Sequence, residues 1–151
     1  MTITLTGDPS AIASAGIGAL YSAWIKAGGQ WGSDMAPRGR WGTVDEFDET
    51  AATLTGTLAM PMPNGVTELP GGIDDRITLE TWEYGTVAQI LHVGSYDSEQ
   101  PTIDRLRAYI TEQGYEIAGE HEEVYLKSVN MFGFGNDKNF LTIIRYPVSK
   151  E

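Results

Sequence analysis

The chain has 151 residues, a length that fits one domain or two small halves packed as one. It carries 21 acidic and 10 basic side chains, and this net charge of −11 argues against binding to a nucleic-acid phosphate backbone. Cysteine is absent, so disulfides, thiolate metal ligands and cysteine nucleophiles are excluded. We expect a cytoplasmic protein without membrane contact, because no apolar run approaches ~20 residues and the start does not resemble a signal peptide.

The first half of the sequence predicts a strand, a helix and two further strands. Residues 2–6 alternate threonine with isoleucine and leucine, which is the period-two pattern of a half-buried strand. Apolar residues then recur at helical spacing over residues 11–27, and the glycine pair 28–29 ends this helix. Extended segments follow over residues 40–47 and 53–62.

The second half follows a connection rich in proline and glycine over residues 63–75. Its predicted elements are a strand over residues 77–82, a strand over 86–93, a helix from Pro101 to Gly114, an extended segment over 115–127 and a strand over 139–148. Residues 1–62 and 86–148 therefore share one order of elements, which suggests a duplicated β-α-β-β unit with repeats at about residues 1–62 and 76–148.

This order predicts a single α+β domain with pseudo-twofold symmetry, in which one curved antiparallel sheet carries both helices on one face. The other face would then hold a ligand cleft. Alternation along residues 121–126 indicates which side chains line that cleft, since neighbouring residues of a strand point to opposite faces. We expect Val124 and Leu126 to point to the helices, and Glu123 and Tyr125 to point into the cleft.

Such a face favours a flat aromatic or cationic ligand, because rings stack and a partly desolvated carboxylate pairs with a cation. A solvated polar face with scattered aromatic side chains explains the same pattern equally well. The predicted ligand-binding residues are Glu123, Tyr125, Trp82, Tyr96, Trp41, Trp24 and Phe134.

Three motifs carry a resemblance to a known family. Residues 119–126, Gly-Glu-His-Glu-Glu-Val-Tyr-Leu, resemble the G-x-H-x-E-I-Y-L stretch of the GyrI-like small-molecule-binding family. Residues 87–96 resemble its strand ending in H-x-G-x-Y, and residues 142–148 resemble its closing T-x-x-R-x-P-V strand. The resemblance is strong over residues 77–148 and weaker before them. The chain departs from the pattern at residues 127–135, where family members often carry a short S-D-P segment. By the resemblance this segment belongs to the rim of the cleft, so the choice of ligand cannot be carried over from the family.

The resemblance implies the duplicated fold, with a ligand cleft between the halves. Relatives in this family include effector-binding domains of multidrug-sensing activators, a gyrase-inhibitory protein, and stand-alone hydrolases that open the cyclopropane ring of DNA-alkylating natural products. The family's buried acid falls on Glu123 and its nearby aromatic residue on Tyr125. We therefore expect a stand-alone GyrI-like domain, monomeric or homodimeric, that sequesters or senses hydrophobic, aromatic and often cationic small molecules without a cofactor.

Two other functions stay open. In the first, the protein is a hydrolase: Glu123 as general base deprotonates a water aimed at a strained carbon, and the Tyr125 hydroxyl stabilises the resulting phenolate. In the second, the acidic surface occupies a protein partner that handles DNA. The short acidic cluster at residues 45–49 permits this function, although a solvated turn explains the cluster as well.

The remaining chemistry-bearing residues predict structural roles. His92 and His121 are the only histidines, and we expect them to be hydrogen-bonded structural residues. We expect no metal site, because two histidines lack an evident third ligand. Arg145 should pair with an acidic neighbour, and the phenylalanines at 132 and 134 should form either an anchored loop or a lid.

Overall fold

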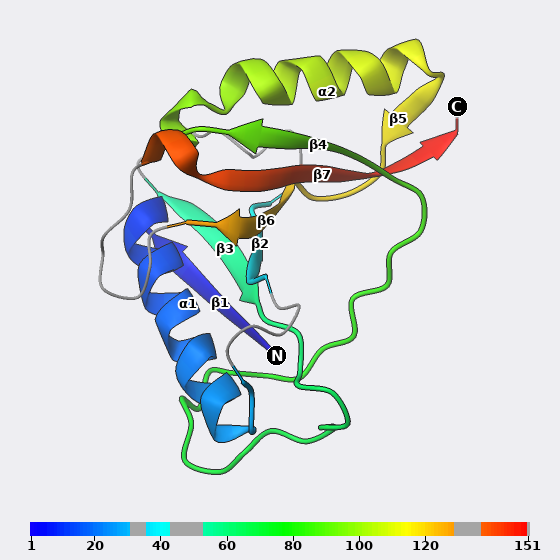
Figure 1. Ribbon diagram of the computed structural model, residues 1–151. Helices are drawn as coiled ribbons and strands as arrows, with labels where there is room; N and C mark the ends of the chain where they lie inside the picture. The colour runs from blue at the N-terminus through cyan, green and yellow to red at the C-terminus, as the bar shows by residue number, and fades with distance from the viewer. Residues whose placement is uncertain (31–35, 43–52, 129–136, 151) are drawn as a thin grey trace. The chain divides into compact units, whose positions relative to one another are not determined.

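A computed structural model describes residues 1–30, 36–42, 53–128 and 137–150 of the chain. The chain divides into two compact units (Figure 1). Unit 1 consists of Met1–Trp41 and Ala51–Trp82, and unit 2 consists of Gly42–Thr50 and Glu83–Glu151. Among the described residues, no helix combines the length and the apolar character that a membrane crossing requires.

Unit 1 is an antiparallel sheet with one helix packed on it. Its elements are β1 (Thr2–Gly7), α1 (Pro9–Lys26), β2 (Arg38–Arg40) and β3 (Leu54–Ala59). The central strand is β3, which pairs with both β1 and β2, and α1 packs against β1 and β3. The Asp8 side chain caps α1 by accepting a hydrogen bond from the Ala11 N–H at 2.9 Å.

The alternation predicted for the first strand is confirmed by the two faces of β1. Ile3 is buried under α1, and a Cβ added to Gly16 of α1 would lie 2.3 Å from Leu58, so helix and sheet approach closely. On the opposite face, the hydroxyls of Thr4 and Thr57 are hydrogen-bonded across the strands at 2.9 Å. One face of this sheet is therefore core, and the other is polar.

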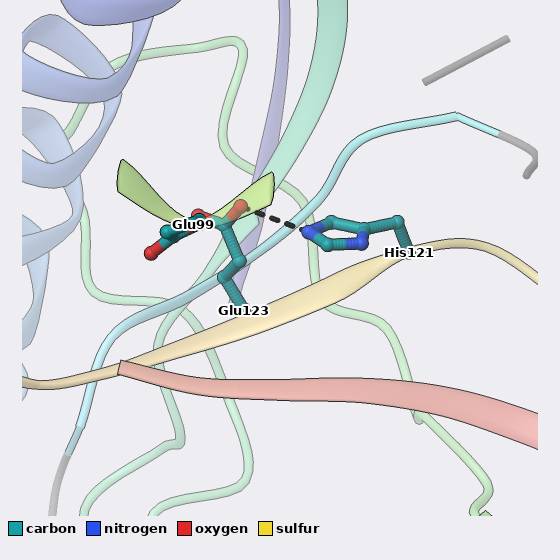
Figure 2. A group of neighbouring side chains, drawn as sticks. All are labelled: Glu99, His121 and Glu123. Atoms are coloured by element: carbon teal, nitrogen blue, oxygen red, sulfur yellow. Dashed lines mark hydrogen bonds and ion pairs between the residues drawn. The ribbon is translucent and has the colours of Figure 1, made fainter. Parts of the chain in front are cut away.

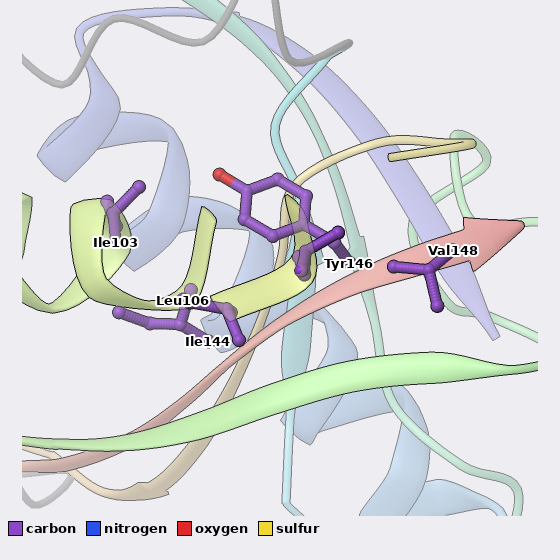
Figure 3. Packing of buried hydrophobic residues seen from close by; sticks show 6 residues of the cluster. Ile103, Leu106, Ile144, Tyr146 and Val148 are labelled. Atoms are coloured by element: carbon purple, nitrogen blue, oxygen red, sulfur yellow. The ribbon is translucent and has the colours of Figure 1, made fainter. Parts of the chain in front are cut away.

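Unit 2 contains the remaining elements. These are β4 (Val87–Val93), the short 3-10 helix η1 (Tyr96–Ser98), α2 (Gln100–Glu112), β5 (Tyr115–Ile117), β6 (Glu122–Lys127), η2 (Asp137–Asn139) and β7 (Leu141–Lys150). The strand β7 pairs with β4 and β6, and its far end pairs with β5. Beneath α2 lies a buried cluster (Figure 3) made of Ile103, Leu106, Ile110, Ile144, Tyr146 and Val148.

The predicted α+β class with antiparallel strands and two helices is confirmed. In each unit a strand and a helix precede further strands, and the last strand of the unit is the one to which the others pair. Whether the two units arose by duplication stays a prediction. The predicted strand over residues 77–82 is wrong, because only Thr78 forms a bridge there, with Thr2. The segment predicted as extended over residues 115–127 is divided into β5 and β6.

The register of β6 on β7 reverses the predicted faces. Residues opposite each other on antiparallel strands point to the same face. Glu123 lies opposite Ile144, which belongs to the buried cluster under α2, so Glu123 lies on the α2 face. Tyr125 lies two residues after Glu123 and so points to the same face. Val124 lies between them and points to the other face, where it is buried with 4% of its surface exposed.

Leu126 was also expected to point to the helices, and it is instead 50% exposed. The register shifts between Tyr125 and Lys127, so Leu126 is the extra residue of a β-bulge. Period-two alternation is interrupted at a bulge, and the sequence pattern contains no sign of this one.

Candidate functional site

Glu99, His121 and Glu123 form a buried group in unit 2 (Figure 2). They are 2%, 0% and 6% exposed, and one ligand atom from each lies within 4.8 Å of those from the other two. The His121 Nε2 and Glu123 Oε1 atoms form a hydrogen bond of 2.9 Å. We call this group, together with the neighbouring rings of Tyr96 and Tyr125, the acidic site.

The motif residues around β6 place Glu123. Ahead of the strand, the Ala118 N–H donates to the Pro147 carbonyl of β7 at 2.9 Å. Gly119 lies so close to the Pro147 ring that an added Cβ would be 2.9 Å from its Cγ. The chain therefore enters β6 tightly along β7, and His121 and Glu123 follow on the α2 face. This packing gives a structural reason for a glycine and a proline in the two motifs.

The H-x-G-x-Y motif ties the end of β4 to the start of α2 through His92. The buried imidazole bonds the Ser95 carbonyl through Nε2 at 3.0 Å, and its Nδ1 bonds the Thr102 hydroxyl at 3.0 Å. Because a carbonyl only accepts, Nε2 is the donor and Nδ1 accepts from the threonine. Gly94 has a φ of 139° and lies in this turn, where an added Cβ would be 3.0 Å from Ser98 Oγ. The turn that follows carries η1 and the first residues of α2.

This turn presents Tyr96 and Glu99 to the acidic site. Glu99 occupies the N-cap position of α2, yet its side chain makes no capping hydrogen bond. Its carbonyl instead accepts from the N–H groups of Thr102 and Ile103, at 2.8 and 3.0 Å. The backbone of Glu99 thus begins the helix, whereas its carboxylate belongs to the buried group.

Aromatic rings line one side of the acidic site. The Tyr96 ring meets Tyr125 edge to face, with centroids 5.9 Å apart, and lies 5.4 Å from the Phe140 ring. Tyr125 and Phe140 are both 6% exposed, whereas Tyr96 is 38% exposed. Tyr96 is therefore held by buried rings and keeps part of its own surface accessible to solvent.

The electrostatics of the site are visible in the titration of Tyr96. Its pKa is raised to about 12, chiefly by burial and also by the carboxylates of Glu123 and Glu99, against a hydrogen bond with Ser128 that lowers it. Its hydroxyl therefore stays protonated at neutral pH and can donate a hydrogen bond.

Behind Glu123, polar groups continue from His121 to α2. The His121 Nδ1 atom lies 2.8 Å from the Tyr146 hydroxyl, and Arg107 Nη2 of α2 donates to the same hydroxyl at 3.3 Å. Burial raises the pKa of Tyr146, although Arg107 opposes this. As predicted, His92 and His121 are both hydrogen-bonded residues, and each uses both ring nitrogens.

The opposite face of β6 holds an ion pair. Arg145 Nη1 lies 3.2 Å from Glu122 Oε1, and the Tyr84 hydroxyl donates to the same oxygen at 2.8 Å. Arg145 Nε also donates to Gln89 Oε1 of β4 at 3.0 Å. The predicted acidic partner for Arg145 is confirmed. Glu122, next to Glu123 in the sequence but on the opposite face of β6, is held in this ion pair.

Of the predicted ligand-binding residues, Glu123, Tyr125 and Tyr96 are brought together in unit 2. Trp24 and Trp41 are buried in unit 1, at 2% and 5% exposure, against Gly29 and Gly56. Their roles as ligand contacts stay predictions.

Trp82 is a half-buried residue of unit 1. Its Nε1 donates to Glu80 at 3.1 Å, and the Arg40 guanidinium lies 3.9 Å above its ring. Phe134 and the acidic cluster at residues 45–49 lie outside the described residues.

Sequence reasoning did not select Glu99, and it assigned His121 no part in the site. An acid directly before a helix is ordinarily a cap or a solvated residue, so the position of Glu99 in the sequence gives no sign of a buried role. One available signal was Tyr146, which alternates with Ile144 and Val148 on a buried strand face. A buried tyrosine needs a hydrogen-bond partner, and its presence could have directed attention to a buried histidine.

Two carboxylates and an imidazole are also ligands that a divalent transition metal accepts. The sequence argument against a metal assumed that no third ligand was available, and Glu99 and Glu123 supply two beside His121. The His121 Nε2 proton is engaged by Glu123, so an ion would have to replace that hydrogen bond. The donor set thus fits a metal only after this rearrangement.

The chain belongs to the family of GyrI-like small molecule binding domains, whose profile matches residues 1–148. An uncharacterised conserved protein from Listeria innocua has a similar structure, with 23% identity, a TM-score of 0.76, and coverage of 98% of this chain and 86% of that one. A hydrolase from Listeria innocua is similar at 21% identity and a TM-score of 0.70, covering 98% and 85% of the two chains.

The C-terminal domain of EcmrR is similar at 17% identity and a TM-score of 0.69, covering 99% of this chain and 91% of that one. These likenesses establish a shared fold. A search of curated protein sequences finds no match.

Proposed function

We propose that this GyrI-like domain binds a hydrophobic, aromatic and positively charged small molecule at the acidic site, and thereby sequesters or senses it. One observation carries the proposal: the buried carboxylates of Glu99 and Glu123 lie in one group beside the partly exposed ring of Tyr96. Opposite charges attract each other more strongly in the low dielectric of a protein interior than in water. A buried pair of carboxylates therefore favours a cationic ligand. The Tyr96 ring supplies a surface for stacking and for cation–π contact.

Each residue has a role in this proposal. Glu123 and Glu99 supply the negative charge, and Tyr96 supplies the ring that a ligand meets. Tyr125 and Phe140 hold that ring by their edge-to-face and tilted contacts. The hydrogen bond from His121 engages Glu123 Oε1, and we assign the other carboxylate oxygen to the ligand.

The family supports ligand binding rather than direct contact with DNA. Small-molecule binding is the property for which the family is described. EcmrR is also known in a complex with DNA, but this chain spans 53% of that EcmrR chain, and its DNA contacts are not carried over. The chain carries a net charge of −11, which opposes binding to a phosphate backbone.

The test compares two aromatic fluorescent probes that differ in charge: ethidium, a cation, and N-phenyl-1-naphthylamine, which is neutral. The Glu123→Gln variant should weaken ethidium by about 1–3 kcal/mol and leave the neutral probe nearly unchanged. Glu112→Gln, an exposed position at the end of α2, is the control for loss of one negative charge. Equal affinity of wild type and Glu123→Gln for ethidium would contradict the proposal.

Hydrolysis of an electrophilic ligand is the alternative, and the pairing of Glu123 with His121 beside the protonated Tyr96 hydroxyl favours it. In this reaction Glu123 accepts a proton from water as the water oxygen bonds to a cyclopropane carbon. The electron pair of the broken carbon–carbon bond passes into the conjugated ring system, where a tyrosine hydroxyl stabilises the phenolate. Mass spectrometry of the ligand should find one water added by the wild type and none by Glu123→Gln.

A further inference from the structure

We propose that His121 is a positioning residue for Glu123, and that Tyr146 and Arg107 fix the tautomer in which it acts. The inference rests on the proposed function, since the affinity for a cation is the property that the orientation of Glu123 would control. None of these supporting groups needs to touch the ligand.

The hydrogen atoms along this chain of groups can be assigned from the partners. An ionised carboxylate only accepts, so the 2.9 Å bond to Glu123 Oε1 places a hydrogen on His121 Nε2. In a neutral imidazole Nδ1 is then an acceptor, and the Tyr146 hydroxyl donates to it at 2.8 Å. A guanidinium only donates, so Arg107 Nη2 donates to the tyrosine oxygen at 3.3 Å. Every donor in the series points toward Glu123.

Burial makes this arrangement consequential. His121 and Tyr146 are each 0% exposed, so water cannot readily replace a lost partner. In the other tautomer, the Nε2 lone pair would face the Glu123 carboxylate. Tyr146 would then have to turn its hydroxyl hydrogen away from Nδ1, in the direction of the Arg107 guanidinium. The supporting groups therefore select the tautomer in which His121 donates to Glu123.

The positions of the groups explain how the chain reaches across unit 2. Arg107 lies on α2, Tyr146 lies on β7, and His121 directly precedes β6. Figure 3 shows the Tyr146 hydroxyl directed away from Ile144 and Val148, so the ring belongs to the buried cluster while its polar end leaves it. A single side chain thus joins the apolar packing to the acidic site.

The central variant is Tyr146→Phe, which keeps the buried ring and removes the hydroxyl. We expect ethidium to bind about 3- to 10-fold more weakly, the usual effect of one hydrogen bond, and N-phenyl-1-naphthylamine to be unaffected. The loss should vanish in the Glu123→Gln background, because the supporting groups act through that carboxylate. Tyr109→Phe, at an exposed position on α2, is the matched control and should bind both probes as wild type does.

A second readout needs no ligand. Nitrogen-15 NMR of the imidazole should find the Nε2–H tautomer of His121 in the wild type and a mixture of tautomers in Tyr146→Phe. If Tyr146→Phe does not fold, Arg107→Met removes the next donor of the series from a half-buried position. We then expect a smaller loss of ethidium affinity and a smaller change in the His121 tautomer than for Tyr146→Phe.

The outcomes separate the two proposals. If Glu123→Gln weakens ethidium but Tyr146→Phe does not, the positioning role is overturned and the proposed function stands. If Glu123→Gln has no effect on ethidium, the proposed function fails. In that case an unchanged His121 tautomer in Tyr146→Phe would overturn the positioning role as well, whereas an altered one would support it.

Discussion

Glu123 and Ile144 are direct neighbours across the β6–β7 pair, on the face of the sheet that α2 covers. A buried carboxylate beside an aliphatic side chain is costly unless it is hydrogen-bonded, and His121 provides that bond. The acidic site therefore lies at the border of the apolar cluster, where polar groups are placed by the same packing that stabilises unit 2.

Val124 and Leu126 should differ sharply when each is replaced by aspartate. Val124 is 4% exposed, so Val124→Asp buries a charge and should destabilise the fold by at least about 3 kcal/mol. Leu126 is 50% exposed on the β-bulge, and Leu126→Asp should change stability by less than about 1 kcal/mol. Urea unfolding of both variants measures this difference. A Leu126→Asp protein as unstable as Val124→Asp would contradict the bulge.

Glu99→Gln should weaken cationic ligands, and it should weaken dications most. Glu99 is 2% exposed and lies in the same buried group as Glu123, so both carboxylates attract the ligand. Propidium, which carries two positive charges, should lose more affinity than ethidium. Asp104→Asn, at an exposed position on α2, removes an equal charge outside the group. Equal losses for Asp104→Asn and Glu99→Gln would show that only the net charge matters.

The titration of Tyr96 should report on both carboxylates. Its pKa is raised to about 12, above the ordinary value of 10, by burial and by Glu123 and Glu99. The folded state therefore retains this proton between about pH 10 and 12, and its contribution to stability is lost as pH rises through that range. The ultraviolet absorbance of tyrosinate, with Tyr96→Phe subtracted, should shift to lower pH in Glu123→Gln. An unshifted titration would place Tyr96 outside the influence of Glu123.

Gly119→Ala should destabilise the protein, because the new Cβ would lie 2.9 Å from Cγ of the rigid Pro147 ring. We expect a loss of roughly 1–3 kcal/mol, the usual cost of overpacking. Gly18→Ala is the control: on α1 its Cβ would meet nothing within 4 Å, and it should stabilise by about 0.5–1 kcal/mol. Thermal unfolding of the two variants measures both effects, and a neutral Gly119→Ala would show that β6 can move away from β7.

Sequence patterns predicted the elements well where local spacing decides them. The helix expected over residues 11–27 is α1, Pro9–Lys26, and the strand expected over 86–93 is β4, Val87–Val93. These segments have long periodic patterns with clear breaks at their ends. Residues 77–82 also alternate, but alternation cannot tell whether a partner strand is present, and only Thr78 has one.

Only part of the candidate site was predicted, and that part came from the motif resemblance and not from local spacing. The motif resemblance identified Glu123 and Tyr125, whereas strand parity assigned them to the wrong face. Parity assumes that the apolar side of a strand is the buried side, and that assumption fails where buried polar groups satisfy one another. Glu99 could not be found by pattern, because its place in the group depends on the turn that His92 ties to α2.

Glu99 belongs both to the start of α2 and to the acidic site. Its carbonyl accepts the hydrogen bonds that begin α2, and its carboxylate lies in the buried group with His121 and Glu123. A ligand that displaces this carboxylate must act on the same residue that anchors the first turn of the helix. If the acidic site binds a cation as proposed, its occupancy and the position of the first turn of α2 should be linked through Glu99.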